Sequence, residues 1–220
     1  MMKKYLIFCG LLLLGISVSA HTINYTLEET SGNRVFIDYV LLGFKHILPL
    51  GLDHILFILC IFFLNKNLKS VLIQASMFTL AHSITLGLTA AGIINPPGSI
   101  VETLIALSIA MLAIENIYRD KVTGARLITI FVFGLVHGMG FAGALAETGI
   151  PNDAFLEAII GFNVGVELGQ ATIILLAFIT ISYNFSKKIW YRRRIIIPIS
   201  LSVLLISLWW TVERFLTIQF

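Results

Sequence analysis

The stretch HILPLGLDH, residues 46–54, lies in the middle of a long apolar segment that runs from about Val35 to Leu64. A transmembrane helix needs about 20 apolar residues, so this segment is longer than one straight span requires. Pro49 removes a backbone hydrogen bond where it sits, and Gly51 follows it closely. The stretch therefore predicts a broken helix: a short outer helix or re-entrant piece, followed by a span that begins at Leu52.

The composition of the chain places this broken helix in a membrane protein. Of the 220 residues, 58% are hydrophobic and 12% are charged, whereas soluble domains carry about 25% charged residues. The same composition excludes a disordered chain, and a net charge of +3 without a long basic block gives no sign of a nucleic-acid partner. We predict an all-α fold, a polytopic membrane helical bundle of six spans over residues 35–220, with the lipid bilayer as its partner. The five later spans are expected at about Leu68–Ile94, Ser99–Tyr118, Ala125–Ala146, Ala154–Ser182 and Ile195–Leu216.

The first 20 residues have the pattern of a signal peptide. Two lysines precede an apolar run over residues 6–18, which is too short for a span, and the sequence VSA at 18–20 resembles a cleavage site. An uncleaved short anchor is the alternative. Cleavage would leave residues 21–34 as a short external segment with His21 at its amino terminus, where the α-amino group and the imidazole could contact a metal together. The mature chain would then hold one thiol, Cys60, and no disulfide.

Lysine and arginine gather in alternate loops between the predicted spans. The loops after the first, third and fifth spans are basic, whereas the loops at residues 95–97 and 147–153 contain no Lys or Arg. The positive-inside rule therefore places the basic loops in the cytoplasm, which agrees with a signal peptide that exports the amino terminus. We predict a multi-pass protein of a bacterial-type inner membrane, with both mature termini outside. The basic residues are Lys66, Lys69, Arg119, Lys121, Arg126, Lys187, Lys188, Arg192, Arg193 and Arg194.

Four histidines, one aspartate and one glutamate lie within the predicted spans and are the candidates for a site at depth. Ionisable side chains at such depth are costly and usually face a cavity or a partner, so each is a functional candidate. A helix rises 1.5 Å per residue, so counting from one end of each span places His54, His82, His137 and Glu167 about 15–21 Å into the membrane. One layer could therefore hold a metal site, with His46 at its outer entrance and Glu167 beside it. Imidazole with carboxylate suits Ni²⁺, Co²⁺ or Zn²⁺. The candidate ligands are His46, Asp53, His54, His82, His137 and Glu167.

Other polar residues are expected to support these ligands. A metal-bound imidazole needs a hydrogen-bond acceptor for its second nitrogen, and Ser83 and Asn163 are close in sequence to the candidates. Asn163, Glu167 and Gln170 share one helix face through their spacing of four and three. Among the acids near span ends, Glu102 is the one that we expect to contribute to the site. The remaining acids near span ends, for which we expect solvated or interfacial positions, are Glu115, Glu157 and Glu213.

A weak internal repeat at an offset of 55 residues relates the second and third spans to the fourth and fifth. His82 matches His137 at this offset, and Pro96 matches Pro151. Parallel repeats occur in transporters, where the substrate site lies at the repeat interface. Coincidence is the alternative, because apolar composition inflates any self-match.

Six motifs together resemble the HupE/UreJ family of membrane proteins: HILPLGLDHILF at 46–57, FTLAHS at 78–83, VE at 101–102, EN at 115–116, HGMGF at 137–141 and FNVGVELGQ at 162–170. The family is associated with nickel uptake for hydrogenase and urease, and some members are assigned nickel or cobalt permease activity. The resemblance implies metal-handling roles for His46, Asp53, His54 and His137.

The chain departs from the nickel-permease pattern at two positions. Six residues separate His46 from the Asp53–His54 pair where those members have five. Phe141 follows HGMG where those members carry an acid soon after the His-Gly pair. The chain thus resembles the second, more divergent branch of the family, for which the metal is less defined.

We therefore expect a permease for a divalent transition-metal cation, with nickel or cobalt as the expected substrate. The sequence contains no Walker motif, so ATP coupling would need another subunit; a homo-oligomer or accessory subunits are compatible with the sequence. A zinc-dependent intramembrane hydrolase is the alternative, with Zn²⁺ held by His and carboxylate ligands beside an open position for water; the absence of a His-Glu-x-x-His motif speaks against it. A structural or assembly subunit, with its histidines bonded between helices, is the third hypothesis.

Overall fold

The computed structural model describes residues 32–64, 67–148, 150 and 152–218. The predicted signal peptide, His21 and most of the segment 21–34 lie outside the described residues. In the part that is described, all regular structure is helical, which confirms the all-α prediction. The longer helices are α2 (Gly32–Ile47), α3 (Leu52–Leu64), α4 (Leu68–Ala90), α5 (Gly98–Tyr118), α6 (Gly124–Thr148), α7 (Phe155–Ala177) and α9 (Ile197–Leu216).

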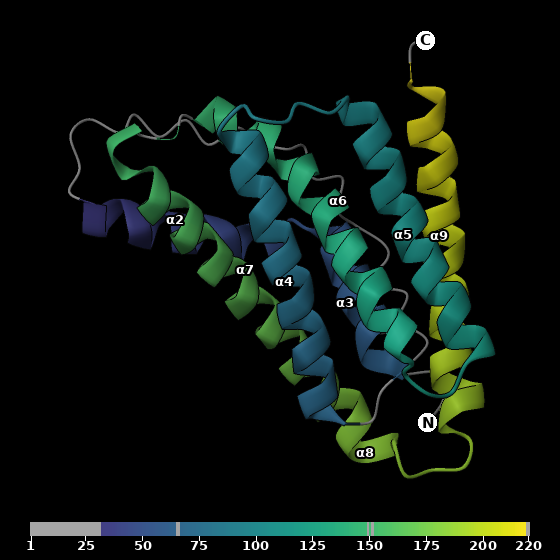
Figure 1. Ribbon diagram of the computed structural model, residues 1–220. Helices are drawn as coiled ribbons and strands as arrows, with labels where there is room; N and C mark the ends of the chain where they lie inside the picture. Colours follow the sequence, from purple (N-terminus) through teal and green to yellow (C-terminus); the bar gives the residue numbers. More distant parts are fainter. Residues whose placement is uncertain (1–31, 65–66, 149, 151, 219–220) are drawn as a thin grey trace.

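Short helical segments connect or extend these seven. A 3₁₀ turn, Asn152–Ala154, precedes α7, and a π-helical turn, Phe178–Ser182, joins α7 to the short α8 (Tyr183–Phe185). A second π-helical turn, Arg192–Ile196, leads into α9. The basic loop between α8 and α9 lies at the lower end of the bundle in Figure 1.

Five continuous helical stretches are long and apolar enough to cross a membrane. They are Leu68–Ala90, Gly98–Tyr118, Gly124–Phe141, Phe155–Phe185 and Arg192–Leu216. The sixth candidate is the pair α2 and α3, which bend by 72° at a short break. This agrees with the prediction of six spans with a broken first span. At 1.5 Å per residue the 13 residues of α3 extend only about 20 Å, so α3 alone is shorter than the hydrocarbon core of about 30 Å.

The break between α2 and α3 depends on a close backbone approach at Gly51. A Cβ atom on this residue would lie 2.3 Å from the carbonyl oxygen of His46, so only glycine fits without a shift. The Gly51 amide donates to the carbonyl of Ile47, and the Leu50 amide donates to the carbonyl of Lys45. These bonds satisfy the last carbonyls of α2 and hold its end directly against the start of α3.

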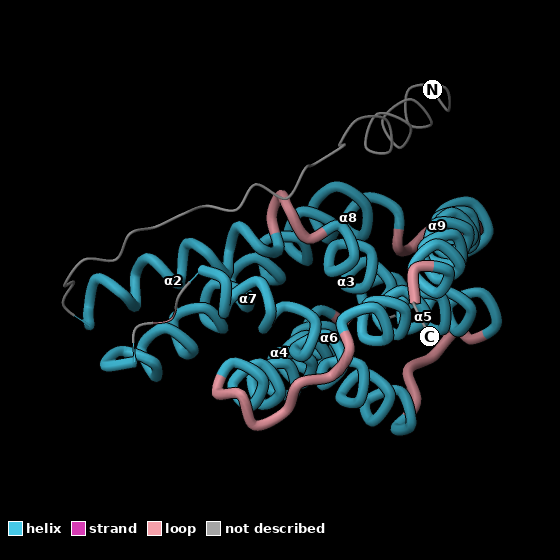
Figure 2. The backbone as a smooth tube through the Cα atoms, turned by 90° about the horizontal axis from the view of Figure 1, so that it is seen from above, coloured by secondary structure: helices cyan, strands magenta, loops and turns pink. Residues whose placement is uncertain are grey.

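Six of the seven longer helices associate in three pairs, α4 with α6, α2 with α7 and α5 with α9, and two of these pairs run parallel. In the α4–α6 pair Gly134 lies against Phe78 and Gly138 against His82, so both chains advance in the same direction. A Cβ on Gly138 would lie 2.2 Å from the His82 carbonyl oxygen, which shows how closely the two backbones approach. Small residues at helix interfaces permit such contact. Figures 1 and 2 show α4 and α6 side by side, with α5 packed against α9 farther along the bundle.

The second parallel pair consists of α2 and α7, which run next to each other in Figure 2. Gly161 lies against Phe36 and Gly165 against Val40, again with both helices advancing together. In Figure 1 this pair is strongly inclined to α4, α5, α6 and α9. The end of α2, the start of α3 and the middle of α4 and α7 consequently converge inside the bundle.

Candidate metal site

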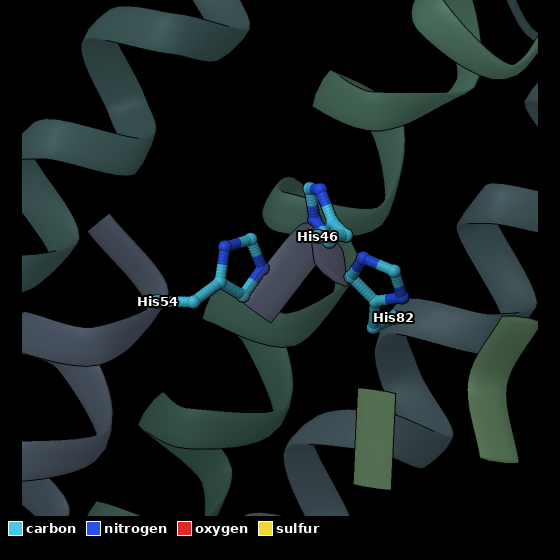
Figure 3. A group of neighbouring side chains, drawn as sticks. All are labelled: His46, His54 and His82. Carbon is cyan, nitrogen blue, oxygen red and sulfur yellow. The ribbon is translucent and has the colours of Figure 1, made fainter. Parts of the chain in front are cut away.

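Three histidines from three helices meet at the break between α2 and α3. His46 lies in the last turn of α2, His54 in the first turn of α3 and His82 within α4. Each offers one ring nitrogen, and these three nitrogens lie within 4.8 Å of one another. Figure 3 shows the three rings turned toward a common space from their separate backbones. We call His46, His54 and His82 the histidine triad.

The ring of His54 is oriented by its neighbour Asp53. The Asp53 carboxylate oxygen Oδ1 accepts the His54 backbone amide at 2.8 Å and lies 3.0 Å from His54 Nδ1. Because a carboxylate can only accept, Nδ1 carries the proton and Nε2 keeps a free lone pair. Asp53 also lies in the first turn of α3, where the helix dipole favours a negative charge. A carboxylate behind a histidine is the usual support for a metal-binding imidazole.

His82 receives equivalent support from α7. Its Nδ1 lies 3.4 Å from Oδ1 of Asn163, while the Asn163 amide nitrogen donates to the carbonyl of Ile159. Since the amide nitrogen is already used, the oxygen faces His82 and accepts its Nδ1 proton. His82 is fully buried, and its Nε2 is left with a lone pair.

His137 of α6 lies next to the triad and forms a different bond. Its Nε2 lies 3.0 Å from Oγ of Ser108, whose hydroxyl donates to the carbonyl of Ile105. His137 therefore donates from Nε2 to Ser108 and keeps its lone pair on Nδ1. The ring centroids of His54 and His137 are 5.1 Å apart, so His137 is a direct neighbour of the triad although it is not among the three converging nitrogens.

Four imidazole nitrogens at this place are buried without a hydrogen-bond partner among the described residues. They are Nε2 of His46, His54 and His82 and Nδ1 of His137. Buried polar atoms are bonded in the large majority of cases, so four unpartnered nitrogens in one cluster point to a missing ligand. Aromatic rings enclose the cluster and keep its surroundings apolar: Phe57, Phe78, Phe141 and Phe162.

The donor set fits a borderline divalent cation. Tetrahedral sites with metal–nitrogen bonds of about 2.0–2.1 Å place their nitrogens about 3.4 Å apart. The triad nitrogens, which are at most 4.8 Å apart, would reach that spacing through small side-chain rotations. Neutral imidazole nitrogens select Ni²⁺, Co²⁺ or Zn²⁺ over Mg²⁺ and Ca²⁺.

The other predicted site residues occupy several different places. Asn163 contacts His82, as described. Ser83 donates to the carbonyl of Thr79 within its own helix. Glu102 forms an ion pair of 3.1 Å with Arg214 of α9. Glu167 accepts a hydrogen bond from Ser76 of α4 at 2.7 Å, and Gln170 is buried on the same face of α7. The structure thus gathers His46, Asp53, His54, His82, His137 and Asn163 into one place, whereas the hydrogen bonds and ion pairs of Ser83, Glu102 and Glu167 are made with residues outside this group.

Sequence reasoning missed the role of Arg126, which it assigned to a basic cytoplasmic loop. The position in a loop is wrong, because Arg126 is 1% exposed in the first turn of α6. Glu115, which is partly exposed near the end of α5, pairs with the buried Arg126 as well as with the exposed Arg119. A charge count along the sequence cannot distinguish a loop arginine from one that turns into the bundle. The other acceptors of Arg126 are Gln74, Asn116 and the carbonyl of Cys60.

The role of Ser108 was also absent from the sequence reasoning. A single serine in an apolar span carries no signal by itself, since its hydroxyl can bond to its own helix. Its importance appears only when α5 and α6 pack together and bring His137 to it.

The fold and the site define a polytopic helical membrane protein with a buried histidine group at a helix break. Residues 22–214 match the family model described as HupE / UreJ protein. The chain therefore belongs to the HupE/UreJ family, which is generally associated with nickel and cobalt transport. No curated protein and no solved structure gives a significant match.

Proposed function

We propose that this protein is a membrane permease for a divalent transition-metal cation, nickel or cobalt in the first place, and that the cation binds at the histidine triad during its passage. The observation that carries the proposal is the set of three converging imidazole nitrogens, each buried and without a partner among the described residues. A histidine with a purely structural role would use its second ring nitrogen in a hydrogen bond between helices. In the triad, by contrast, Nε2 of each histidine is buried without a hydrogen-bond partner among the described residues.

The helix break supports transport in preference to permanent metal storage. Transporters commonly place their substrate site where a membrane helix is discontinuous, because the two half-helix ends supply oriented charge. Here the end of α2 carries His46 and the start of α3 carries Asp53 and His54. A negative dipole end and a carboxylate both favour a cation at this position.

Membership of the family is the reason for proposing nickel or cobalt as the transported metal. Its general association with nickel and cobalt transport agrees with imidazole ligands, which bind Ni²⁺ and Co²⁺ well. Zn²⁺ fits the same ligands and is the natural competitor. We propose the inner membrane of a bacterial-type cell as the location, with the basic loops cytoplasmic and the mature termini outside. Ion-coupled movement or an accessory subunit would supply the energy, since the chain contains no Walker motif.

The proposal is tested with purified protein in two measurements. Titration with Co²⁺ reports imidazole ligation through visible absorption, and uptake of Co²⁺ into proteoliposomes reports transport. We expect both from the unmodified chain, with bound metal that exchanges within the time of the uptake assay. A protein that binds the metal but never releases it would contradict a permease and favour the zinc hydrolase. A protein that neither binds nor moves Co²⁺, Ni²⁺ or Zn²⁺ would contradict the metal function.

A further inference from the structure

Helix α7 carries a polar face of which the histidine site uses only one member, Asn163. Asn163, Glu167 and Gln170 share one face of the helix through their spacing of four and three. Asn163 is bonded to His82. At 1.5 Å per residue, Glu167 and Gln170 follow it by about 6 and 10 Å. They lie toward the end of the bundle that holds the basic loop 186–194.

Glu167 is incompletely bonded at this position. Its Oε1 accepts the hydroxyl of Ser76 at 2.7 Å, whereas its Oε2 is buried with no hydrogen-bond partner among the described residues. No ion pair of Glu167 with Lys, Arg or His occurs within the described part of the chain. An acid within a membrane helix is costly and is usually kept for a partner or a pathway. One carboxylate oxygen is thus available for a cation.

Gln170 is the second, independent sign of a ligand. Its side chain is 1% exposed, and both its amide oxygen and its amide nitrogen lack a hydrogen-bond partner among the described residues. A buried amide with both ends unbonded is uncommon, because each end loses its bonds to water on burial. Glu167 and Gln170 are three residues apart, so they lie about one helical turn from each other on the same face of α7.

We infer that Glu167 and Gln170 form a second station for the transported cation, built from oxygen donors and placed beyond the histidine triad toward the basic-loop end. This inference rests on the proposed permease function. A borderline cation binds imidazole more strongly than amide or carboxylate oxygen, so the second station holds the ion more weakly than the first. Passage requires sites that bind well enough to accept the ion and weakly enough to release it. Glu167 and Gln170 supply the release step.

If Glu167 and Gln170 form a second station, a substitution there should reduce Co²⁺ uptake without changing Co²⁺ binding at the triad. The substitution Glu167→Gln keeps the shape of the side chain and removes its charge, and Glu157→Gln is the matched control because Glu157 is an exposed acid on the same helix. We expect Glu167→Gln to bind Co²⁺ at the triad with the affinity and visible spectrum of the unmodified protein, while Co²⁺ uptake into proteoliposomes falls at least about tenfold. Gln170→Leu should also lower uptake without changing the spectrum. Glu167→Asp, which restores a carboxylate, should recover part of the uptake.

Each result decides a separate question. Unchanged uptake in Glu167→Gln and Gln170→Leu, with normal uptake by the unmodified chain, would overturn the second station and leave the permease intact. An equal loss of Co²⁺ affinity and uptake in Glu167→Gln would also overturn it, because Glu167 would then belong to the triad site or to the fold. Absence of binding and uptake in the unmodified chain would instead overturn the proposed function. The triad spectrum serves in every variant as the control for a folded protein.

Discussion

Asp53 acts on the triad through His54, to which its carboxylate is bonded by backbone and ring. The adjacent Asp-His pair indicated this contact, the family motifs indicated His46 and His137, and the depth of His82 in its predicted span made it a candidate as well. The residue that hydrogen-bonds to the other ring nitrogen of each histidine was harder to predict from the sequence. Asn163 was expected from its place in the polar face of α7, whereas Ser108 was not, since its contact exists only because α5 and α6 bring two distant residues together.

At the residue scale the first prediction concerns Asp53 and His54. His54→Ala removes a triad nitrogen and should eliminate the Co²⁺ spectrum. Asp53→Asn keeps all three nitrogens but weakens the support of the His54 ring, so Co²⁺ affinity should fall by about 10–100-fold. Titration of each purified variant measures both effects. Asp120→Asn, which changes an exposed acid in the loop after α5, should bind as the unmodified protein does. Normal affinity in His54→Ala would show that the triad is not the site.

At the element scale the α4–α6 pair is held by close backbone contact. Gly138→Ala would place a Cβ 2.2 Å from the His82 carbonyl oxygen and force the helices apart, which should destabilise the protein by roughly 1–3 kcal/mol. Gly87→Ala is the control on α4, because a Cβ there meets nothing within 4 Å and alanine raises helix stability by roughly 0.5–1 kcal/mol. Unfolding in detergent by increasing denaturant gives both values. Equal stability of the two variants would contradict the contact.

The buried Arg126 connects four helices and gives a further prediction at this scale. Its guanidinium donates to α3, α4 and α5 through the carbonyl of Cys60, Gln74 and Glu115. Arg126→Leu would remove the main partner of the partly buried Glu115, which would keep only its looser pair with Arg119, and should destabilise the protein by roughly 3–5 kcal/mol. The double variant Arg126→Leu with Glu115→Leu should recover part of that loss, because no unpaired charge remains. Comparison of the denaturant midpoints tests this, and a double variant less stable than the single one would refute it.

At the scale of the whole molecule, the sequence predicted the number and kind of spans better than their arrangement. Apolar length and the Pro49 and Gly51 pair were enough to indicate six spans with the first one broken. The pairing of α2 with α7 and of α5 with α9 could not be read from periodicity, because a lipid-facing surface and a helix-facing surface are both apolar. Gly161, Gly165 and Gly169 recur at intervals of four, a spacing that allows another helix to approach α7 closely but does not identify α2 as that helix.

The orientation of the whole bundle in the membrane is the last prediction. The loop around Asp120 and the loop around Gly98 lie at opposite ends of α5, and both residues are exposed. The loop after α5 carries Arg119 and Lys121, whereas the turn before it is NPPG without any basic residue, so the positive-inside rule places the former in the cytoplasm. A membrane-impermeant maleimide added to intact cells should therefore label Gly98→Cys and should label Asp120→Cys only after the cells are opened. Cys60 gives little background because it is buried. The reverse labelling pattern would overturn the proposed orientation of the bundle.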